Sequence, residues 1–580
     1  MKPDWTDLGP LTDFPEGAPA LRKDAAGRRY ACVRQGDAVH AVDDRCPHQG
    51  YPLSQGSVRG GVLTCEWHNW KFELGTGTCT FGGEAVRRFP TRIEDGRVHL
   101  DRAIDRGAEA RRLTASLRQA LYRDDAPRAL REGLRLGDLG IGPVGSGLGR
   151  LALGFELVAI DGAERAEYGF DHGLALLADL ASWVERGWIG AEEAFALGAR
   201  AVAEPSLHLG ARGAPAAGAQ SSRGALARMV DVEESEPTRV SEALVAERRD
   251  EADALVRAVV EARGPEGAYT ALMPFVTRHL YDYGHGAIFL TKALELSRRF
   301  PAAATEVMAS VTAMLAWATA ETSLPPFRAT QEAIGQAAEL EVAPGRGGDL
   351  ADRPAYEAEV LQGEREALRA TLAELRAGVD PVTILRAVAH AAATRLRRFD
   401  LAWEHRMDAE VSVLEVSHAV TFAEAAVTLA AAPGASHRHA AQLAVIAAGF
   451  TGRLRRGDAA EPLAPTRAEG SLVEAVTARD VGRALAIAAG LDAAGRRAAY
   501  RELAPFAAFD AAVRPILYAH TVKVTEALHR LDQADAAADG MYLEALLTYL
   551  TPVHPENRAR RTGAVARQFL ADGRPPEGLY

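Results

Sequence analysis

Hydrophobic and polar positions follow two different periods along this chain, and the change comes near residue 101. Upstream, apolar and polar residues alternate in short runs, as at 29–33 and 38–42 on either side of the turn at 35–37, and residues 98–100 end the segment. Alternation with a period of two is typical of half-buried strands, and a Gly-containing turn between two runs favours a hairpin. We therefore expect a small antiparallel all-β domain at the N-terminus.

From residue 102 to the end, Ala, Leu, Arg and Glu dominate, and the apolar residues recur at helical spacing. At 580 residues, the chain is long enough for two to four domains. We predict a multidomain fold in which the small antiparallel β domain is followed by a large all-α domain. The expected boundaries are 1–104 for the β domain, 105–150 for a helical and Gly-rich linker, and 151–580 for the helical domain.

Two Cys-His pairs lie in the β segment. Cys46 and His48 form the first pair, and Cys65 and His68 form the second pair 16 residues further along. A Rieske centre needs two thiolates on one iron of a [2Fe–2S] cluster and two imidazoles on the other. The spacing resembles that of the Rieske [2Fe–2S] family over residues 1 to about 101. The alternative is a structural Cys2His2 zinc site, but zinc motifs usually pair like ligands with like.

The resemblance also bears on the potential of the cluster. High-potential respiratory Rieske proteins carry an extra Cys in each loop and hydroxyl donors near the cluster, whereas this chain has Tyr51, Trp67, Trp70 and Phe72 at those places. Fewer hydrogen bonds to sulfur leave the reduced state less stabilised, so we expect a midpoint potential toward the low end of the Rieske range, about −150 mV. The other two cysteines, Cys32 and Cys79, are expected to be buried free thiols.

A repeated histidine stands out in the helical part. His172, His285, His418 and His520 each precede small and apolar residues at helical spacing, at intervals of 113, 133 and 102 residues. Tyrosines lie just upstream of three of these histidines, namely Tyr168, Tyr281, Tyr283 and Tyr518. One buried His is usually a hydrogen-bonded core residue, but four in equivalent positions predict that facing helices aim them at one metal. Imidazole suits iron, and a Rieske cluster is an electron source for it.

A lysine is a candidate fifth ligand. Lys523 lies three residues after His520 on the same helix face, and carbon dioxide would convert it into an anionic oxygen ligand. Lys292, seven residues after His285, is the competing candidate.

The segments around Ser417-His418 and Ala519-His520, with the His520-x-x-Lys523 arrangement, resemble the questin-oxidase-like family. That family includes non-heme iron oxygenases that cleave a ring C–C bond of anthraquinone-type polyketides and hold iron with four histidines and a carboxylated lysine. The resemblance implies the ligand set His172, His285, His418, His520 and Lys523. The fused Rieske domain departs from ordinary members of that family.

Three alternatives stay open. Ordinary Rieske oxygenases hold iron in an α/β domain with two His and one Asp, but the expected Asp-x-x-His-x-x-x-x-His run is absent from this sequence. A ferritin-like di-iron oxidase would use the Glu-x-x-His pairs that begin at Glu415 and at Glu526, the second of which ends at His529. Finally, the helical part could be a non-catalytic docking module on an electron-transfer or redox-sensing protein.

The composition limits the classes of binding partner. The net charge of −11 and the absence of dense basic tracts argue against nucleic acid and anionic membranes, and no signal segment or apolar span is evident, so we expect a cytoplasmic protein. We predict an O2-dependent oxygenase with a [2Fe–2S] cluster and a mononuclear Fe(II), acting on a small aromatic or quinone-like substrate. An external reductase or ferredoxin would donate the electrons, and a homo-oligomer is left open.

Overall fold

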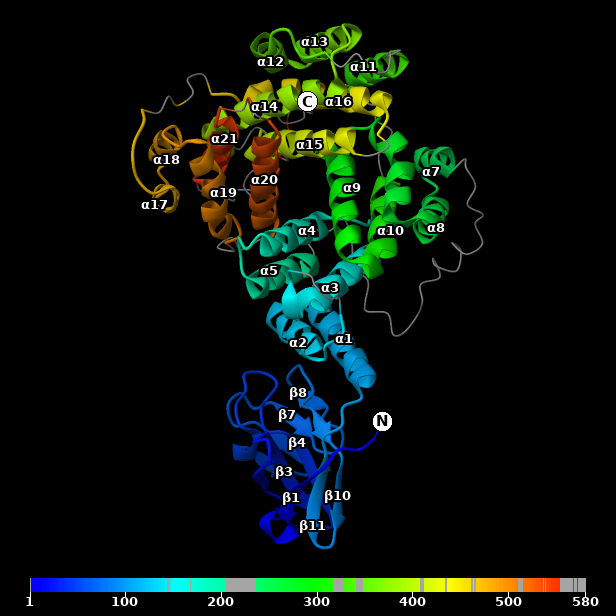
Figure 1. Cartoon of the computed structure of the whole chain (residues 1–580), viewed down its shortest axis with the longest axis vertical. Coiled ribbons are helices and arrows are strands. Elements are labelled where there is room, and N and C mark those ends of the chain that lie inside the picture. Colours follow the sequence, from blue (N-terminus) through cyan, green and yellow to red (C-terminus); the bar gives the residue numbers. More distant parts are fainter. Residues whose placement is uncertain are drawn as a thin grey trace. The chain divides into compact units, whose positions relative to one another are not determined.

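The structure is a computed structural model. It describes residues 2–142, 147–166, 168–204, 236–316, 321, 327–340, 348–406, 411–432, 435–459, 463, 466–509, 515–535, 537, 539–552, 567 and 571. The chain divides into two compact units, Met1–Gly142 and Pro143–Tyr580. Strands come first and helices follow (Figure 1), which confirms the expected fold class.

Three antiparallel sheets make up the β part of the first unit, in the orders β1-β11-β10, β2-β3-β4-β9 and β5-β6-β7-β8. The strands are β1 (Trp5–Pro10), β2 (Pro19–Lys23), β3 (Arg29–Gln35), β4 (Ala38–Asp43), β5 (Ser57–Arg59), β6 (Val62–Thr64), β7 (Lys71–Glu73), β8 (Cys79–Phe81), β9 (Arg88–Phe89), β10 (Thr91–Glu94) and β11 (Arg97–Asp101). The expected hairpin is β3–β4, in which Gln35 pairs with Ala38. Gly36 supplies the positive φ of +60° that its two-residue turn requires.

Two apolar clusters hold this part together. One of them contains Cys46 and Cys65 among buried β-strand residues such as Val42, Leu63 and Phe72. The other contains Cys32 with Tyr30 and Phe89. Cys79 is only partly buried, so the expectation of a buried thiol is met by Cys32 alone.

Residues 105–142 are part of the first unit, where the sequence had indicated a linker. Helices α1 (Arg106–Tyr122) and α2 (Ala126–Asp138) form a hairpin. Asp105 and Asp125 accept hydrogen bonds from backbone N–H groups at the starts of α1 and α2. The glycine-rich stretch that follows lies partly at 143–146, outside the described residues.

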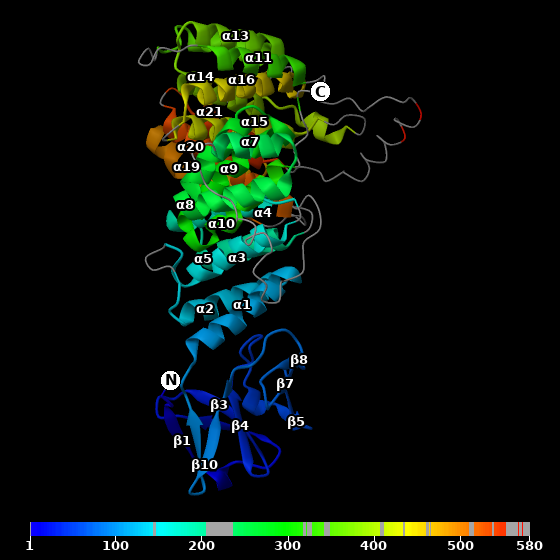
Figure 2. The ribbon, with the colours of Figure 1, turned by 90° about the vertical axis from the view of Figure 1, so that its right-hand side faces the viewer.

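The second unit is built from helices (Figures 1 and 2). Their bounds are α3 (Ala152–Arg165), α4 (His172–Glu185), α5 (Ala191–Ala203), α7 (Glu236–Val245), α8 (Arg249–Val276), α9 (Tyr281–Arg299), α10 (Ala304–Leu315), α11 (Arg328–Glu339), α12 (Arg353–Gln362), α13 (Glu364–Arg376), α14 (Pro381–Arg397), α15 (Val413–Ala431), α16 (His437–Arg453), α17 (Leu472–Thr477), α18 (Val481–Ala488), α19 (Ala493–Ala507), α20 (Pro515–Ala534) and α21 (Met541–Leu550).

Four of these helices close a ring. α4 packs on α9, α9 on α15, α15 on α20, and α20 back on α4. Figure 1 shows the four around a common centre, with α9 and α20 joined by α15 at one end and by α4 at the other. The helices therefore bring together residues that are more than a hundred positions apart in sequence.

One of the four is unusually apolar. Among the described residues, α15 is the one helix long and apolar enough to cross a membrane, with a mean hydropathy of 1.3, and 78% of that stretch is buried within the protein. A helix that is hydrophobic all round is typical of a protein core.

Candidate metal centres

The two Cys-His loops of the first unit have the same backbone geometry. In the first loop, Cys46 donates its N–H to the carbonyl of Tyr51 and accepts from Gly50 N–H, at 2.9 and 2.8 Å. In the second, Cys65 does the same with Trp70 and Asn69, at 2.8 and 3.0 Å. The closing residues Gly50 and Asn69 both have positive φ, +78° and +60°, which Gly and Asn adopt most readily.

These loops bring the four predicted cluster ligands together. Cys46 and Cys65 are buried, and the rings of His48 and His68 lie 4.7 Å apart between centroids. The indole of Trp70 stacks on His48 at 4.5 Å and 7°. Nδ1 of His48 is buried without a hydrogen-bond partner, so its lone pair is available to a metal. Two thiols and two imidazoles presented in this way fit a [2Fe–2S] cluster.

At the centre of the helical ring, the four predicted histidines meet. Nε2 of His285 lies 3.1 Å from Nε2 of His172 and 3.1 Å from Nε2 of His418. Nε2 of His520 lies 3.4 Å from that of His418, and Nζ of Lys523 lies 3.3 Å from the same atom. All five residues predicted from the sequence therefore share one buried site.

In three of the rings, the hydrogen bond made by Nδ1 fixes the tautomer. Nδ1–H of His418 donates to the carbonyl of Leu414 at 2.6 Å, and Nδ1–H of His520 donates to that of Ile516 at 2.7 Å. Nδ1 of His285 faces the carboxylate of Asp282 at 2.9 Å. Since carbonyl and carboxylate oxygens only accept, the proton sits on Nδ1, and Nε2 of each ring keeps a bare lone pair.

Burial keeps these rings neutral. It lowers the pKa of His172, His418 and His520 well below the usual value for histidine. It also lowers the pKa of His285, against the opposing effect of Asp282. Burial lowers the pKa of Lys523 to about 7. Neutral imidazole is the form that binds metals.

The spacing matches the demands of a metal ion. Bare lone pairs that face one another at 3.1 to 3.4 Å repel unless a cation lies between them. Metal–imidazole bonds of about 2.1 Å, the length known for zinc, set neighbouring nitrogens about 3.0 Å apart when they meet at right angles. The residues present therefore fit a metal ion, and imidazole donors suit iron, zinc, copper and nickel alike.

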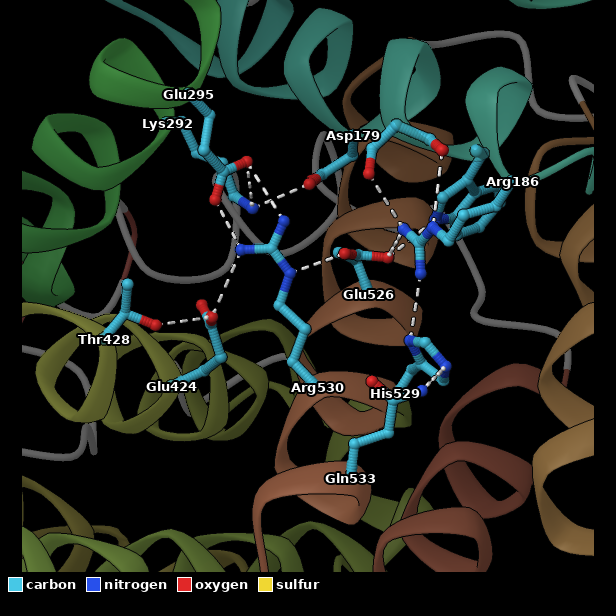
Figure 3. Close-up of polar contacts among 12 residues, drawn as sticks. Asp179, Arg186, Lys292, Glu295, Glu424, Thr428, Glu526, His529, Arg530 and Gln533 are labelled. Atoms are coloured by element: carbon cyan, nitrogen blue, oxygen red, sulfur yellow. Dashed lines mark hydrogen bonds and ion pairs between the residues drawn. The ribbon is translucent and has the colours of Figure 1, made fainter. Parts of the chain in front are cut away.

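Lys292 does not join this site. Its ammonium pairs with Asp179 at 2.7 Å and with Glu295 at 3.4 Å (Figure 3). The carboxylates of Asp179 and Glu295 raise the pKa of Lys292 despite its burial. Lys523 is thus the lysine that lies among the histidines.

The glutamates of the two Glu-x-x-His pairs of the di-iron alternative bind other partners, and only His418 of these pairs lies in the histidine site. Glu526 accepts from Trp183 at 2.8 Å and from the guanidinium groups of Arg186 and Arg530, and His529 contacts Arg186 at 3.0 Å (Figure 3). Glu415 instead caps the start of α15 by accepting from Ser412 N–H at 3.1 Å. The geometry therefore does not support a di-iron site from these pairs.

Of the tyrosines upstream, Tyr283 lies beside the centre, with its ring 5.7 Å from that of His418 and its hydroxyl 3.3 Å from Glu415. Tyr518 is buried and donates to the carbonyl of Leu197 at 3.4 Å. Tyr168 lies in the turn before α4 and is partly buried, and the side chain of Tyr281 lies outside the described residues.

Two residues around the site are not indicated by the repeated histidines in the sequence. Asp282 orients His285 from three positions upstream, and the ring of Phe289 stacks on His285 at 4.7 Å from four positions downstream. A spacing of four residues places side chains on one helix face, so Phe289 could have been found by examining the neighbours of His285 at that distance. Asp282 lies in the non-helical start of α9, so helical spacing does not predict its contact with His285.

An open pocket of about 850 Å³ lies elsewhere in the helical unit, lined among others by Glu357, His390, Arg398 and Arg455. None of the four histidines or Lys523 lines it.

Comparison with known proteins identifies the first unit. Residues 4–90 match the model of the Rieske [2Fe–2S] domain. The chain is similar to a 4beta-methylsterol monooxygenase of Methylococcus capsulatus, 52% identical over 92 residues, which cover 14% of this chain and 22% of that protein. It is also similar to an anthranilate 1,2-dioxygenase ferredoxin subunit of Burkholderia cepacia, 37% identical over 101 residues, which cover 17% of this chain and 92% of the subunit.

Among solved structures, a Sphingomonas yanoikuyae B1 ferredoxin aligns with 17% of this chain and 100% of its own length, at 22% identity. The TM-score of this alignment is 0.17. The two relatives named above are thus similar to this chain over a segment of Rieske-domain size, and the match spans about a fifth of the length of the methylsterol monooxygenase.

Proposed function

Because the chain belongs to the Rieske [2Fe–2S] family through its N-terminal domain, we propose that it is a Rieske-fused oxygenase whose second metal is a mononuclear non-heme iron in the helical unit. The iron ligands are His172, His285, His418, His520 and Lys523. The observation that carries the proposal is the convergence of bare imidazole lone pairs in one buried site.

The choice of iron as the second metal depends on the presence of the Rieske domain in the same chain. Imidazole donors do not select one metal, but a [2Fe–2S] cluster passes electrons one at a time, which a redox-inactive ion such as zinc could not accept. Several relatives of the Rieske domain are named as oxygenases or as ferredoxins of oxygenase systems. Bound at this site, the iron would supply the activation of O2.

The protein's own residues prepare the site. The carbonyls of Leu414 and Ile516 and the carboxylate of Asp282 hold the Nδ1 protons, so the Nε2 atoms stay turned to the centre. Hydrogen bonds of this kind orient ligands and make them more basic. The aromatic ring of Phe289 packs on His285 and helps to exclude water from that side.

We propose that Lys523 binds as a carbamate. Its amine lies 3.3 Å from Nε2 of His418, within the ligand group, where an ammonium would repel a metal cation. The lone pair of the neutral amine forms an N–C bond to carbon dioxide while one C=O π bond breaks, and the nitrogen gives one proton to water, which leaves an anionic oxygen donor in place of the amine.

The substrate is proposed from the resemblance to the questin-oxidase-like family. We infer a small aromatic or anthraquinone-like polyketide, which the enzyme oxidises with O2 and whose ring C–C bond it cleaves. An external reductase or ferredoxin donates the electrons to the cluster.

Metal analysis of the purified chain tests the proposal. We expect about three irons per chain, two in the cluster and one in the helical unit. His418→Ala and His520→Ala should each lower the content to about two and leave the visible and EPR spectra of the Rieske cluster unchanged. If the wild type holds only two irons, the helical unit is better explained as a docking module.

The two buried lysines provide a matched pair. Lys523→Ala should weaken binding of the third iron, whereas Lys292→Ala should retain it. Lys292→Ala should still lower the free energy of unfolding by about 3–5 kcal/mol, because it leaves Asp179 buried without its cation. Retention of the third iron at full affinity by Lys523→Ala would contradict the assignment of Lys523.

A further inference from the structure

The α1–α2 hairpin contacts the loops that hold the cluster, although it lies outside the residues matched by the Rieske family model. The match ends at residue 90, and the hairpin runs from Arg106 to Asp138 within the same compact unit. The hairpin is therefore an addition to the Rieske domain.

The first contact reaches the loop between two cluster ligands. Nη2 of Arg135, on α2, donates to the carbonyl oxygen of Pro47 at 2.6 Å. Pro47 stands between Cys46 and His48. The guanidinium of Arg135 therefore contacts the residue that separates a thiolate ligand from an imidazole ligand of the cluster.

The second contact is a buried ion pair. The side chain of Glu84, in the loop between β8 and β9, is 0% exposed and lies 2.5 Å from Nε of Arg131. Arg135 approaches the same carboxylate at 3.7 Å. Because a buried carboxylate is costly to leave unpaired, this contact fixes α2 firmly against the β domain.

The loop that carries Glu84 also supports the aromatic neighbour of His48. A Cβ added to Gly82, whose φ is +136°, would lie 2.4 Å from the ring of Trp70, and one added to Gly83 would lie 3.3 Å from it. The same ring stacks on His48. The loop that pairs with α2 through Glu84 therefore lies against Trp70, which in turn stacks on a ligand of the cluster.

We propose that the α1–α2 hairpin tunes the cluster, with Arg131 and Arg135 raising its midpoint potential, Glu84 lowering it, and Arg135 holding the first ligand loop in place. Reduction adds one electron to the cluster. Nearby positive charge stabilises the reduced state, and nearby negative charge destabilises it. The inference depends on the Rieske domain alone and stands whether or not the helical unit binds iron.

Redox titration of the full-length protein with its cluster tests the proposal. We expect Arg131→Gln and Arg135→Gln to lower the midpoint potential and Glu84→Gln to raise it. Arg135→Lys keeps the charge and should stay close to the wild type. Arg106→Gln is the matched control, because it removes one positive charge from an exposed position of the same hairpin and should leave the potential unchanged.

Shifts of the midpoint potential in opposite directions would distinguish electrostatic tuning of the cluster from a merely structural role of these residues. If the acid and base variants shift the potential in the same direction, or none differs from Arg106→Gln, the proposal is wrong. Should a single variant fail to retain its cluster, the double variant Glu84→Gln/Arg131→Gln removes one charge of each sign without leaving a buried ion unpaired. Its potential should lie near that of the wild type, and a large shift would reject tuning by charge.

A second measurement addresses the ligand loop. Arg135→Gln should lose its cluster several-fold faster than Arg106→Gln when a chelator is added, as followed by the visible spectrum. Equal rates of cluster loss would show that the Arg135–Pro47 contact does not hold the loop.

Discussion

At the scale of single residues, three of the four histidines of the helical centre are each oriented by one oxygen atom. His418 and His520 use the carbonyl four residues upstream in their own helix, so any sequence that keeps the helix also keeps these partners. His285 is different, because its partner is the side chain of Asp282. The orientation of His285 can therefore be changed by substitution without altering a ligand.

Asp282→Asn provides that test. The amide is a weaker acceptor than the carboxylate, and loss of a hydrogen bond behind a metal-bound histidine typically costs 10- to 100-fold in metal affinity. Titration with Fe(II), and with Co(II) as a spectroscopic substitute, should show a loss in this range. Asp250→Asn, at an exposed position of α8, is the matched control and should bind metal like the wild type. Equal affinities in both variants would remove Asp282 from the site.

At the scale of elements, the start of α9 has an unusual backbone. Asp282, Tyr283 and Gly284 have φ values of +43°, +59° and +88° in succession before regular helix begins. Two of these residues are not glycine, and residues held in this region cost of order 1–3 kcal/mol each. The kinked start lets the carboxylate of Asp282 fold back onto His285, which explains why the strain is tolerated.

Gly284→Ala tests the importance of this kink. A Cβ at position 284 would lie 2.3 Å from the ring of Phe422 on α15, and the φ of +88° also disfavours it. We expect a loss of about 1–3 kcal/mol in the free energy of unfolding, together with weaker iron binding. Urea unfolding followed by circular dichroism measures the first, and metal analysis measures the second.

Gly335→Ala is the control for that substitution. Gly335 lies within α11, is exposed, and has open space at its Cβ position. Alanine should be neutral or stabilise by up to about 1 kcal/mol, because glycine is the poorer helix former. Equal effects at positions 284 and 335 would mean that the kink contributes nothing special.

At the scale of the whole molecule, each of the two units has its own set of metal-ligand candidates. The first unit contains all four cluster ligands and its own apolar core, and the second contains all four converging histidines. No ligand candidate of either centre comes from the other unit. The two metal functions should therefore be separable by cutting the chain.

Fragments 1–142 and 143–580 make this testable. We expect fragment 1–142 to fold and show the Rieske visible and EPR spectra with two irons. Fragment 143–580 should hold about one iron and lack those spectra. A fragment 143–580 that is folded but holds no iron would argue against the proposed helical centre.

The sequence by itself determined the cluster site, because the ligand loops are local: each Cys lies two or three residues from its His, and the β3–β4 hairpin depends on a two-residue turn. It also determined the helical character of residues after 101, since a helix is set by its own periodicity. The histidine candidates for the second centre came from their repetition and Lys523 from its spacing to His520, and neither pattern places these residues in space.

Only the tertiary structure decided which distant residues come into contact. The packing of α4, α9, α15 and α20 into a ring brings together histidines 102 to 133 residues apart, and it separates Lys523 from Lys292, which the sequence could not distinguish. The contact of Arg135 with Pro47 spans 88 residues and had no local signal. Contacts of this kind depend on which helix faces pack together, and a sequence period does not specify the partner of a face.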